Sequence, residues 1–555
     1  MIAVSGRTNY TNGVRMKDSV CRFFPALCAM FVSNLAFADN DLSADTKISF
    51  NQPVIAFVNI EGVDRMPDAK TDDFKAWFEY RDANGVYFKK RVILNAQGNS
   101  SLAYAKKNFA VDFCEDEWIG DETCDITIGN WVKQDSFHFK AYWLDTFRGG
   151  LAVAMGYKFY EDMVADEPRF QERAGLSSFT SKALCHPDGF PCVVSLNGEF
   201  YGLFSWQLKK HRRNMDMAKD NPQHVHFELT NYTNSLKSGI VLWDDIEVKN
   251  PKTLTDESKG YIDSFAKYNL ELEKLRQSLS KEEMRAEIEK RYDVRSVIDY
   301  IIHGLLTSNV DGFGKNIQFF TYDGRKWFCS PYDLDLTYGT LWTLDFQFPA
   351  DWSFFNTDYR LIPYISSDVP FRWIVMYFWD EVKERYAFLR RNRVINVSSM
   401  MSRLKEWNDR IGRQFFEQEY AKWPDSPCIK ERILNEGWES VESWKDYYTT
   451  GAYDENKTYN QGDMCVYNYH VYKAIGSHKG VPPISKGGFT DNEERVCGWL
   501  ERRIELEDDY LEFSPTNISF PVSHPAANVR KCLSDGRLFI VRDSVKYGVD
   551  GVKYR

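Results

Sequence analysis

The chain has 555 residues, and its 70 Lys and Arg against 80 Asp and Glu leave a formal net charge of −10. This length allows two to four domains, and an acidic balance without a basic block argues against a nucleic-acid binder. After the amino terminus, no apolar run reaches the roughly 18 residues that a membrane-spanning helix needs. The composition therefore favours a secreted globular enzyme.

The amino terminus has the pattern of a removable export signal. A basic segment begins after Met16, and an apolar run covers residues 23–37. Ala36-Phe37-Ala38 then has the small-residue pattern of a cleavage site. This order is typical of a secretory signal peptide. We therefore expect residues 1–38 to be a leader, with Met16 as an alternative start, and a secreted or cell-surface product that begins at Asp39.

The first predicted structural unit is rich in strands. Apolar and polar residues alternate between residues 46 and 115, most clearly in 54–60 and 87–94. A period of two predicts half-buried strands. We expect a β-rich amino-terminal lobe.

Helices are expected to dominate the next part of the chain. Residues 151–163 and 270–292 have helical spacing, and residues 280–283 have the Ser-x-x-Glu pattern of a capping box. The helical pattern continues over 294–418, interrupted by a hairpin region between residues 311 and 338. A Pro-containing linker at 422–427 then breaks the pattern.

Nine cysteines follow the leader, which is in keeping with an oxidising compartment. Cys114 with Cys124 and Cys185 with Cys192 enclose short polar loops, so these pairs are candidate disulfides. The odd count leaves at least one thiol free, and Cys329 on a predicted core strand is the candidate. No CxxC pair occurs, so no zinc site is predicted.

The most informative residues are acidic and lie near the middle of the chain. Asp311 is followed by Asn316 and, after one strand-like run, by Asp333. Protein kinases use this layout, in which one Asp meets the acceptor hydroxyl while the Asn and the later Asp hold magnesium on the nucleotide phosphates. Asp335 shares a face with Asp333. The structural alternative is a turn, since Asp311-Gly312 is also typical of a hairpin corner.

Four segments, in this order, resemble the CotH family of kinase-like proteins, which is named after spore coat protein H. They are Gln97-Gly98-Asn99-Ser100-Ser101 with the strand from Lys106 to Phe113, Lys140 to Arg148, Leu196 to Phe204, and Asp311 to Gly339. With a helical tail, the resemblance covers about residues 45–430. It implies an α+β, atypical protein-kinase-like fold with a β-rich N-lobe and a mainly helical C-lobe.

The resemblance also implies roles for individual residues. They are Asp311 as the catalytic residue, Asn316, Asp333 and Asp335 as ligands of Mg²⁺ or Mn²⁺, and Lys107, Arg148 and Gln207 as ATP contacts. Gln207 stands where the family often has Glu. Alternation along the strand from Lys107 predicts that Lys107, and not Lys106, faces the cleft. Since no Walker loop or GxGxxG is present, phosphate cradling is assigned to residues 98–101.

A second unit, residues 446–505, resembles the small chitin- or cellulose-binding modules of secreted chitinases. The matching residues are Tyr459 to Asp463, Val466-Tyr467, Val471 to Ala474, Pro482-Pro483 and Trp499. The resemblance implies a small all-β module in which aromatic faces stack on sugar rings. The chain departs from the pattern after Ala474, where tryptophans are usual, so we expect weak sugar binding. The tail, 506–555, resembles export-related carboxy-terminal tails.

Together the resemblances imply a secreted kinase that moves phosphate from ATP to Ser or Thr hydroxyls of extracellular or surface proteins. Chitin or cellulose is a further partner; no nucleic acid and no membrane span are expected. Two alternatives remain open at this point. Asp333 and Asp335 form a DxD pair that suits a metal-dependent glycosyltransferase. A non-catalytic, carbohydrate-associated binding protein with a degenerate kinase fold is the other.

Overall fold

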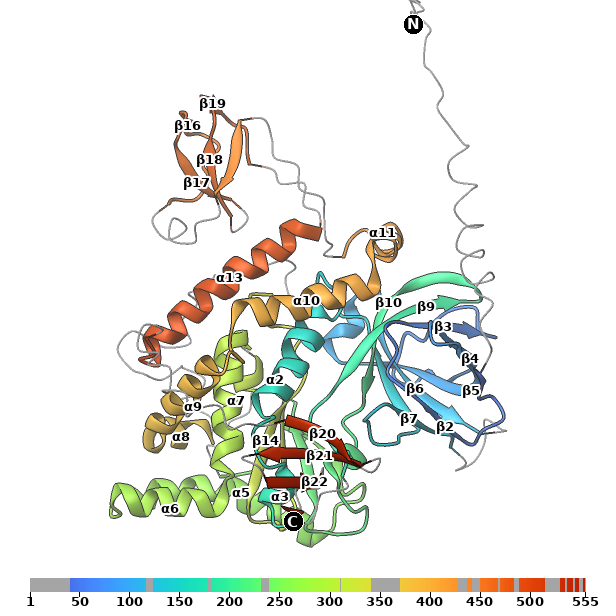
Figure 1. Cartoon of the computed structure of the whole chain (residues 1–555), viewed down its shortest axis with the longest axis vertical. Coiled ribbons are helices and arrows are strands. Elements are labelled where there is room, and N and C mark those ends of the chain that lie inside the picture. Colours follow the sequence, from blue (N-terminus) through green and yellow to red (C-terminus); the bar gives the residue numbers. More distant parts are fainter. Residues whose placement is uncertain are drawn as a thin grey trace, which may run out of the picture.

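The structure is a computed structural model of the whole chain. It describes residues 40–115, 123–176, 181–230, 239–309, 311–340, 370–426, 437–441, 450–467, 470–483 and 489–514, and four short strands between 530 and 554. The predicted leader, residues 1–38, and the cleavage site after Ala38 lie outside the described residues. Figure 1 shows a β-rich part beside a part dominated by helices.

The β-rich part is built on one sheet with the strand order β1-β5-β4-β3-β9-β10-β8-β6, and β5 also pairs with β6, so that the sheet closes on itself. Its strands are β1 (Asn40–Asp41), β3 (Ala56–Glu61), β4 (Phe74–Asp82), β5 (Val86–Gln97), β6 (Asn108–Cys114), β8 (Ser136–Lys140), β9 (Gly189–Leu196) and β10 (Glu199–Leu208). A short parallel pair, β2 (Lys47–Phe50) and β7 (Asp125–Ile128), completes this part.

The strands form because apolar residues recur at every second position. Along β5 every second residue from Phe88 to Ala96 is buried, which confirms the predicted alternation. Inside the sheet, Phe78, Tyr80, Phe88 and Trp206 pack ring against ring. Burial of such large rings is the main stabilising contribution of this part.

The helical part surrounds a second sheet with the order β12-β11-β13-β14. Its strands are β11 (Val225–Leu229), β12 (Ile246–Asn250), β13 (Ile317–Thr321) and β14 (Trp327–Pro331). The predicted hairpin region is confirmed, since β13 and β14 pair antiparallel. This hairpin carries polar residues at its open end, where the acidic side chains of the sequence pattern lie.

The helices begin with η2, a π-helix (Gly150–Tyr157), which α2 (Lys158–Met163) continues, so the helix predicted over 151–163 is confirmed. Up to residue 426, the further α-helices in the described part are α3 (Phe170–Arg173), α5 (Asp256–Leu275), α6 (Lys281–Arg291), α7 (Val294–Thr307), α8 (Phe371–Tyr377), α9 (Trp379–Arg391), α10 (Val397–Ile411) and α11 (Arg413–Lys422). The helical spacing predicted over 270–292 is confirmed in two helices with a break between them, because α5 ends at Leu275 and α6 begins at Lys281. The predicted capping box at Ser280 and Glu283 is confirmed and starts α6 at that break.

The small carboxy-terminal β unit has different boundaries from those predicted. It contains β15 (Trp438–Val441), β16 (Thr458–Tyr459), β17 (Met464–Tyr467), β18 (His470–Ala474) and β19 (His478–Lys479). We call these five strands the β module. The prediction of an all-β unit over 446–505 is wrong at both ends, because β15 precedes residue 446 and pairs with β18, while Phe489–Tyr510 forms helix α13. Trp499, predicted to close the module, is buried on α13 instead.

Beyond α13, β20 (Arg530–Ser534), β21 (Arg537–Arg542), β22 (Val545–Gly548) and β23 (Lys553–Tyr554) form an antiparallel sheet. In the part of the chain that the structure describes, no helix is both long and apolar enough to cross a membrane.

The predicted disulfides are not formed. Cys114, Cys124, Cys185 and Cys192 are all free thiols. Cys185 and Cys192 are buried in different hydrophobic clusters, with Cys192 on β9 and Cys185 ahead of that strand. Cys329 is free and buried, as predicted.

Candidate functional site

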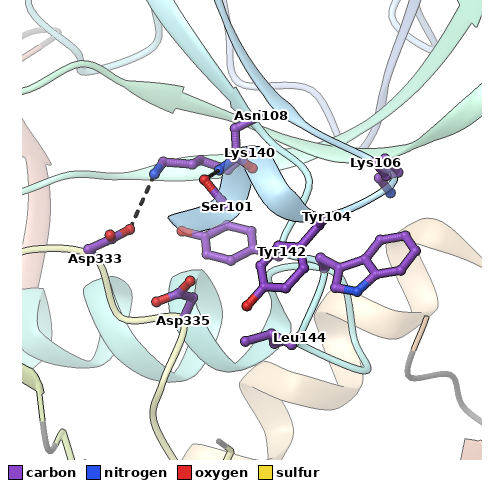
Figure 2. A pocket seen from close by; sticks show the side chains of 10 residues that line it. Ser101, Tyr104, Lys106, Asn108, Lys140, Tyr142, Leu144, Asp333 and Asp335 are labelled. Carbon is purple, nitrogen blue, oxygen red and sulfur yellow. Dashed lines mark hydrogen bonds and ion pairs between the residues drawn. The ribbon is translucent and has the colours of Figure 1, made fainter. Parts of the chain in front are cut away.

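A pocket lies where the closed sheet meets the loop that follows β14 (Figure 2). It is a small cavity of about 10 Å³. Its lining is Ser101, Tyr104, Lys106, Asn108, Lys140, Tyr142, Trp143, Leu144, Asp333 and Asp335. Most of these residues are polar or aromatic, which suits a charged ligand that also carries a ring.

The loop between β5 and β6 forms one wall of the pocket. Gly98 begins this loop with a φ of +115°, and a Cβ there would lie 1.9 Å from Ser101 Oγ. Only glycine is compatible with this conformation and contact. Asn108 Nδ2 donates to Ser101 Oγ at 3.2 Å, and the backbone N–H of Ala141 donates to Asn108 Oδ1 at 2.7 Å. Asn108 thereby fixes the loop to the chain that leaves β8.

Two of the predicted metal ligands face this loop. Asp333 and Asp335 follow β14, and Asp333 has a left-handed backbone with φ of +53°. Lys140 Nζ lies 3.2 Å from Asp333 Oδ1 (Figure 2). Burial acts to raise the pKa of Asp333, but the positive charges of Lys140, Lys210 and Lys315 hold it below its ordinary value. Asp333 is therefore ionised at neutral pH.

Asp335 is in the opposite electrostatic situation. Burial raises the pKa of Asp335 well above its ordinary value, and the charges of Asp333 and Asp311 raise it further against the opposing effect of Lys140. Lys315 also opposes the rise, but Asp335 still favours its protonated form, and a bound cation would favour the ionised form instead.

Asp311 joins the same acidic group from a different element. It begins η5 (Asp311–Phe313), directly after the end of α7, and its carboxylate forms an ion pair with Lys315 Nζ at 2.9 Å. Its charge acts on Asp335, so the structure brings together three acidic residues that the sequence separates. The predicted alternative of a hairpin corner is wrong, because Asp311-Gly312 starts a helical turn, not the β13–β14 turn.

Asn316 lies beside this group but does not line the pocket. It precedes β13 with a φ of +58°, and its backbone N–H donates to the carbonyl of Leu229 at 2.7 Å. Because Ile317 pairs with Pro331, Asn316 and Asp333 lie at the same end of the β13–β14 hairpin. The metal roles of Asn316, Asp333 and Asp335 stay predictions.

The prediction that Lys107 faces the cleft and Lys106 does not is wrong. Lys106 lines the pocket, whereas Lys107 Nζ donates to the carbonyl of Tyr104 at 3.0 Å and lies 3.9 Å from the exposed Asp68. Alternation fails here because β6 starts only at Asn108, so the two lysines precede the strand.

Arg148 is fully buried and belongs to an ionic cluster with Lys106. Glu419 on α11 accepts hydrogen bonds from Lys106 Nζ and from Arg148 Nε, the latter at 2.9 Å. The same carboxylate accepts the backbone N–H of Leu203 at 2.8 Å, and Arg148 also donates to Ser426 Oγ at 2.6 Å. We call Lys106, Arg148 and Glu419 the buried ionic cluster. It joins the closed sheet to the helical part directly behind the pocket.

Gln207 does not line the pocket itself but contacts a residue that does. Its Nε2 donates to the hydroxyl of Tyr142 at 2.5 Å, and Tyr142 lines the pocket. In this structure Gln207 therefore orients a lining residue. The ATP contact of Gln207 stays a prediction.

Lys140, Asn108 and Glu419 are among the residues in and behind the pocket to which the sequence analysis gave no role. Lys140 carried one usable signal, since it is a lysine in an otherwise buried strand, where lysine is rare without a partner. For Asn108 and Glu419, the sequence contained no signal that could have identified them. Glu419 lies 313 residues from Lys106, a separation that no local pattern reports.

The oxygen donors of the pocket suit a hard divalent cation. Within the described residues, no group of three His, Cys, Asp or Glu side chains converges closely enough to form a metal site by itself. Asp333, Asp335 and the neighbouring Asn316 nevertheless offer carboxylate and amide oxygens, the ligands that Mg²⁺ and Mn²⁺ prefer.

Comparison with protein families agrees with this geometry. Residues 94–456 match the family described as CotH kinase protein. The match covers more than half of the chain, so the chain belongs to the CotH kinase family. The matched range begins within β5 and ends within the β module, and α13 lies outside it. No curated protein matches the chain.

Membership of this family gives the pocket its general class. The family is kinase-like, which suggests a phosphotransferase that uses ATP and a divalent metal ion with protein substrates. Such chemistry requires groups that bind phosphate and metal ions. The Gly98 loop, Lys140 and the acidic residues of the pocket are groups of this kind.

Proposed function

We propose that the chain is a secreted protein kinase that transfers the γ-phosphoryl group of ATP to Ser or Thr hydroxyls of extracellular or surface proteins. One observation carries the proposal. Asp333 and Asp335 lie in one pocket with Lys140 and with Ser101 of the Gly98 loop, and the charge of Asp311 acts on Asp335. Phosphoryl transfer depends mainly on positioning and charge neutralisation, and this arrangement supplies both.

The roles follow from the charges. Asp333, Asp335 and Asn316 would hold a Mg²⁺ or Mn²⁺ ion, which neutralises charge on the phosphates when bound. Lys140 supplies a positive charge at the same place, and residues 98–101 offer backbone N–H groups and hydroxyls to phosphate oxygens. Residues on three separate elements therefore converge on the position of the triphosphate.

Asp311 is assigned to the acceptor. Its carboxylate accepts the proton of the substrate hydroxyl as the hydroxyl oxygen attacks the γ-phosphorus, and the bond to the β–γ bridging oxygen breaks to release ADP. Lys315 holds the carboxylate by an ion pair at 2.9 Å. A glycosyltransferase built on Asp333 and Asp335 would leave Asp311 without a role.

The location and the second partner are also proposals. The leader pattern of residues 1–38 supports export, and the β module supports weak association with chitin or cellulose. Trp438, Tyr459 and Tyr472 of the module are buried against one another and against its core, so they are not available as sugar platforms. This burial is the physical reason to expect weak binding.

The test uses the mature chain, residues 39–555, with labelled ATP, Mg²⁺ or Mn²⁺, and an extract of secreted proteins. We expect Asp333→Asn to weaken nucleotide binding by calorimetry, because it removes an anionic ligand at constant shape. Asp311→Asn should retain nucleotide binding and lose transfer, because this carboxylate meets the acceptor. Asp409→Asn, an exposed residue of α10, is the matched control and should behave like the parent.

Three results would contradict the proposal. The first is a parent that binds a sugar nucleotide but no ATP, which would support the glycosyltransferase. The second is a parent that binds neither, which would support a non-catalytic binding protein. The third is equal binding and transfer in the parent and in both site variants.

A further inference from the structure

Helix α13 returns the chain from the β module to the helical part. It packs against α10 and α7 (Figure 1). Trp499, Leu500 and Ile504 are buried in the main hydrophobic core. The helix therefore belongs to the kinase-like body, although it follows the β module in sequence and lies beyond the family match.

One side chain of α13 supports the loop that carries Asp333 and Asp335. The ring of Trp499 meets the ring of Tyr338 edge-on, with centroids 5.8 Å apart. Tyr338 ends the acidic loop and is fully buried. Its hydroxyl donates to the carbonyl of Met155 at 2.8 Å, and its backbone N–H donates to the carbonyl of Thr307 at 2.6 Å. Tyr338 thus joins the acidic loop to the end of α7, and Trp499 packs against that junction.

A second side chain of α13 supports the other loop. Arg503, only 2% exposed, donates from Nε to the carbonyl of Leu305 at 2.8 Å. Leu305 lies in the last turn of α7, where a positive charge is favourable, and its carbonyl also accepts the backbone N–H of Ser308 at 3.2 Å. Four residues after Thr307, the last residue of α7, stands Asp311. Arg503 therefore holds the segment from which the proposed catalytic carboxylate projects.

Trp499 and Arg503 are four residues apart and lie on one face of α13. One contacts the base of the acidic loop and the other the base of the Asp311 loop. We infer that α13 is a positioning element of the kinase site, with Trp499 and Arg503 as positioning residues that set the two loops relative to each other. This inference rests on the proposed function.

The two contacts predict different kinetic effects. Arg503→Gln should lower kcat for transfer by about 10- to 100-fold, since a displacement of about 1 Å at a reacting group has this effect. It should leave the Kd of ATP with Mn²⁺ unchanged, because the α7 carbonyl that Arg503 contacts leads to Asp311, and Arg503 pairs besides with Glu507 on α13 itself. Trp499→Ala should raise that Kd as well, because it loosens the acidic loop.

Conservative variants and a neighbouring residue provide the controls. Arg503→Lys and Trp499→Phe should recover part of the lost kcat and Kd, because they keep the charge and the ring. Arg502→Gln changes the neighbouring arginine, which forms a surface pair with Glu505, and should match the parent. A merely structural role would lower the yield or melting temperature without splitting kcat from Kd.

Hydrogen exchange of the full mature chain gives a readout that does not depend on activity. We expect Arg503→Gln to speed amide exchange in residues 308–315 and Trp499→Ala to speed it in 333–340, with no change in β3. Unchanged exchange in both loops overturns the inference, as does an equal loss of kcat in Arg502→Gln. If the parent transfers no phosphate while these exchange shifts occur, the proposed function fails and the positioning of the loops by α13 stands.

Discussion

Replacement of Glu419 by Gln would remove the only carboxylate of the buried ionic cluster. Glu419, Lys106 and the Arg148 side chain are all buried, and one carboxylate binds both cations and the backbone N–H of Leu203. Although burial acts to raise the pKa of Glu419, Lys106 and Arg148 hold it below its ordinary value. The substitution keeps the shape and removes the charge, so two cations lose their counter-ion.

The expected cost is large. Removing one partner of a buried ion pair destabilises by about 3–5 kcal/mol, because the remaining charge is left without compensation. At about 2 °C per kcal/mol for a domain of this size, the melting temperature should fall by roughly 6–10 °C. Calorimetry or circular dichroism of the mature protein measures the change. Glu417→Gln, on the exposed side of the same helix, is the matched control and should shift it by less than about 1 °C.

The fall in melting temperature caused by Glu419→Gln should also depend on pH. Burial lowers the pKa of Lys106 from 10.5 to about 8, with Glu419 raising it against this effect. A lysine whose pKa is lower in the folded than in the unfolded state binds fewer protons when folded, so stability rises with pH above the folded value. Without Glu419, the pKa of Lys106 in the folded protein drops below about 8. The rise of stability with pH therefore begins at a lower pH in the variant than in the parent.

The difference in melting temperature between parent and Glu419→Gln should therefore shrink from about pH 7 to pH 9. It should not vanish, because Arg148 stays charged. A fall of less than about 2 °C at pH 7, or a difference that grows with pH, would refute the reasoning that the cluster stabilises by charge pairing.

Three further predictions concern the pocket and the leader. Lys140→Met removes a cation that lowers the pKa of Asp333, so the acid limb of the kcat/KM profile should move to higher pH; an unmoved limb would show that Asp333 does not titrate there. Gly98→Ala forces a Cβ against Ser101 Oγ at a φ of +115°, and strain of about 1–3 kcal/mol should weaken ATP binding about tenfold or more; calorimetry with equal affinity would mean that the loop does not touch nucleotide. Intact-mass measurement of the secreted protein should show a chain that begins at Asp39, and a retained leader would contradict the predicted cleavage.

Local patterns predicted the parts of the fold that depend on near neighbours. The alternation within β5, the capping box that starts α6 and the β13–β14 hairpin follow from residue spacing and turn chemistry. The acidic residues Asp311, Asp333 and Asp335 were also predictable, because phosphate chemistry requires those residue types in that order.

Contacts between distant segments were not predictable in this way. The sequence pattern favoured Lys107 over Lys106, but the strand starts one residue later and Lys106 finds Glu419 on a helix far along the chain. The pattern also placed Trp499 in the β module, whereas it packs against Tyr338 in the helical part. A short motif match cannot show which of two bodies a residue packs against.

The sequence by itself therefore determined the local elements, the family resemblance and the residue types of the pocket, because period, capping and ligand chemistry act over a few residues. Only the tertiary structure decided that Lys140 faces Asp333, that Glu419 joins Lys106 to Arg148, and that α13 supports both loops. These contacts arise when the buried surfaces of separate elements meet. Their partners are selected by packing and by the need to compensate buried charge, and neither leaves a period in the chain.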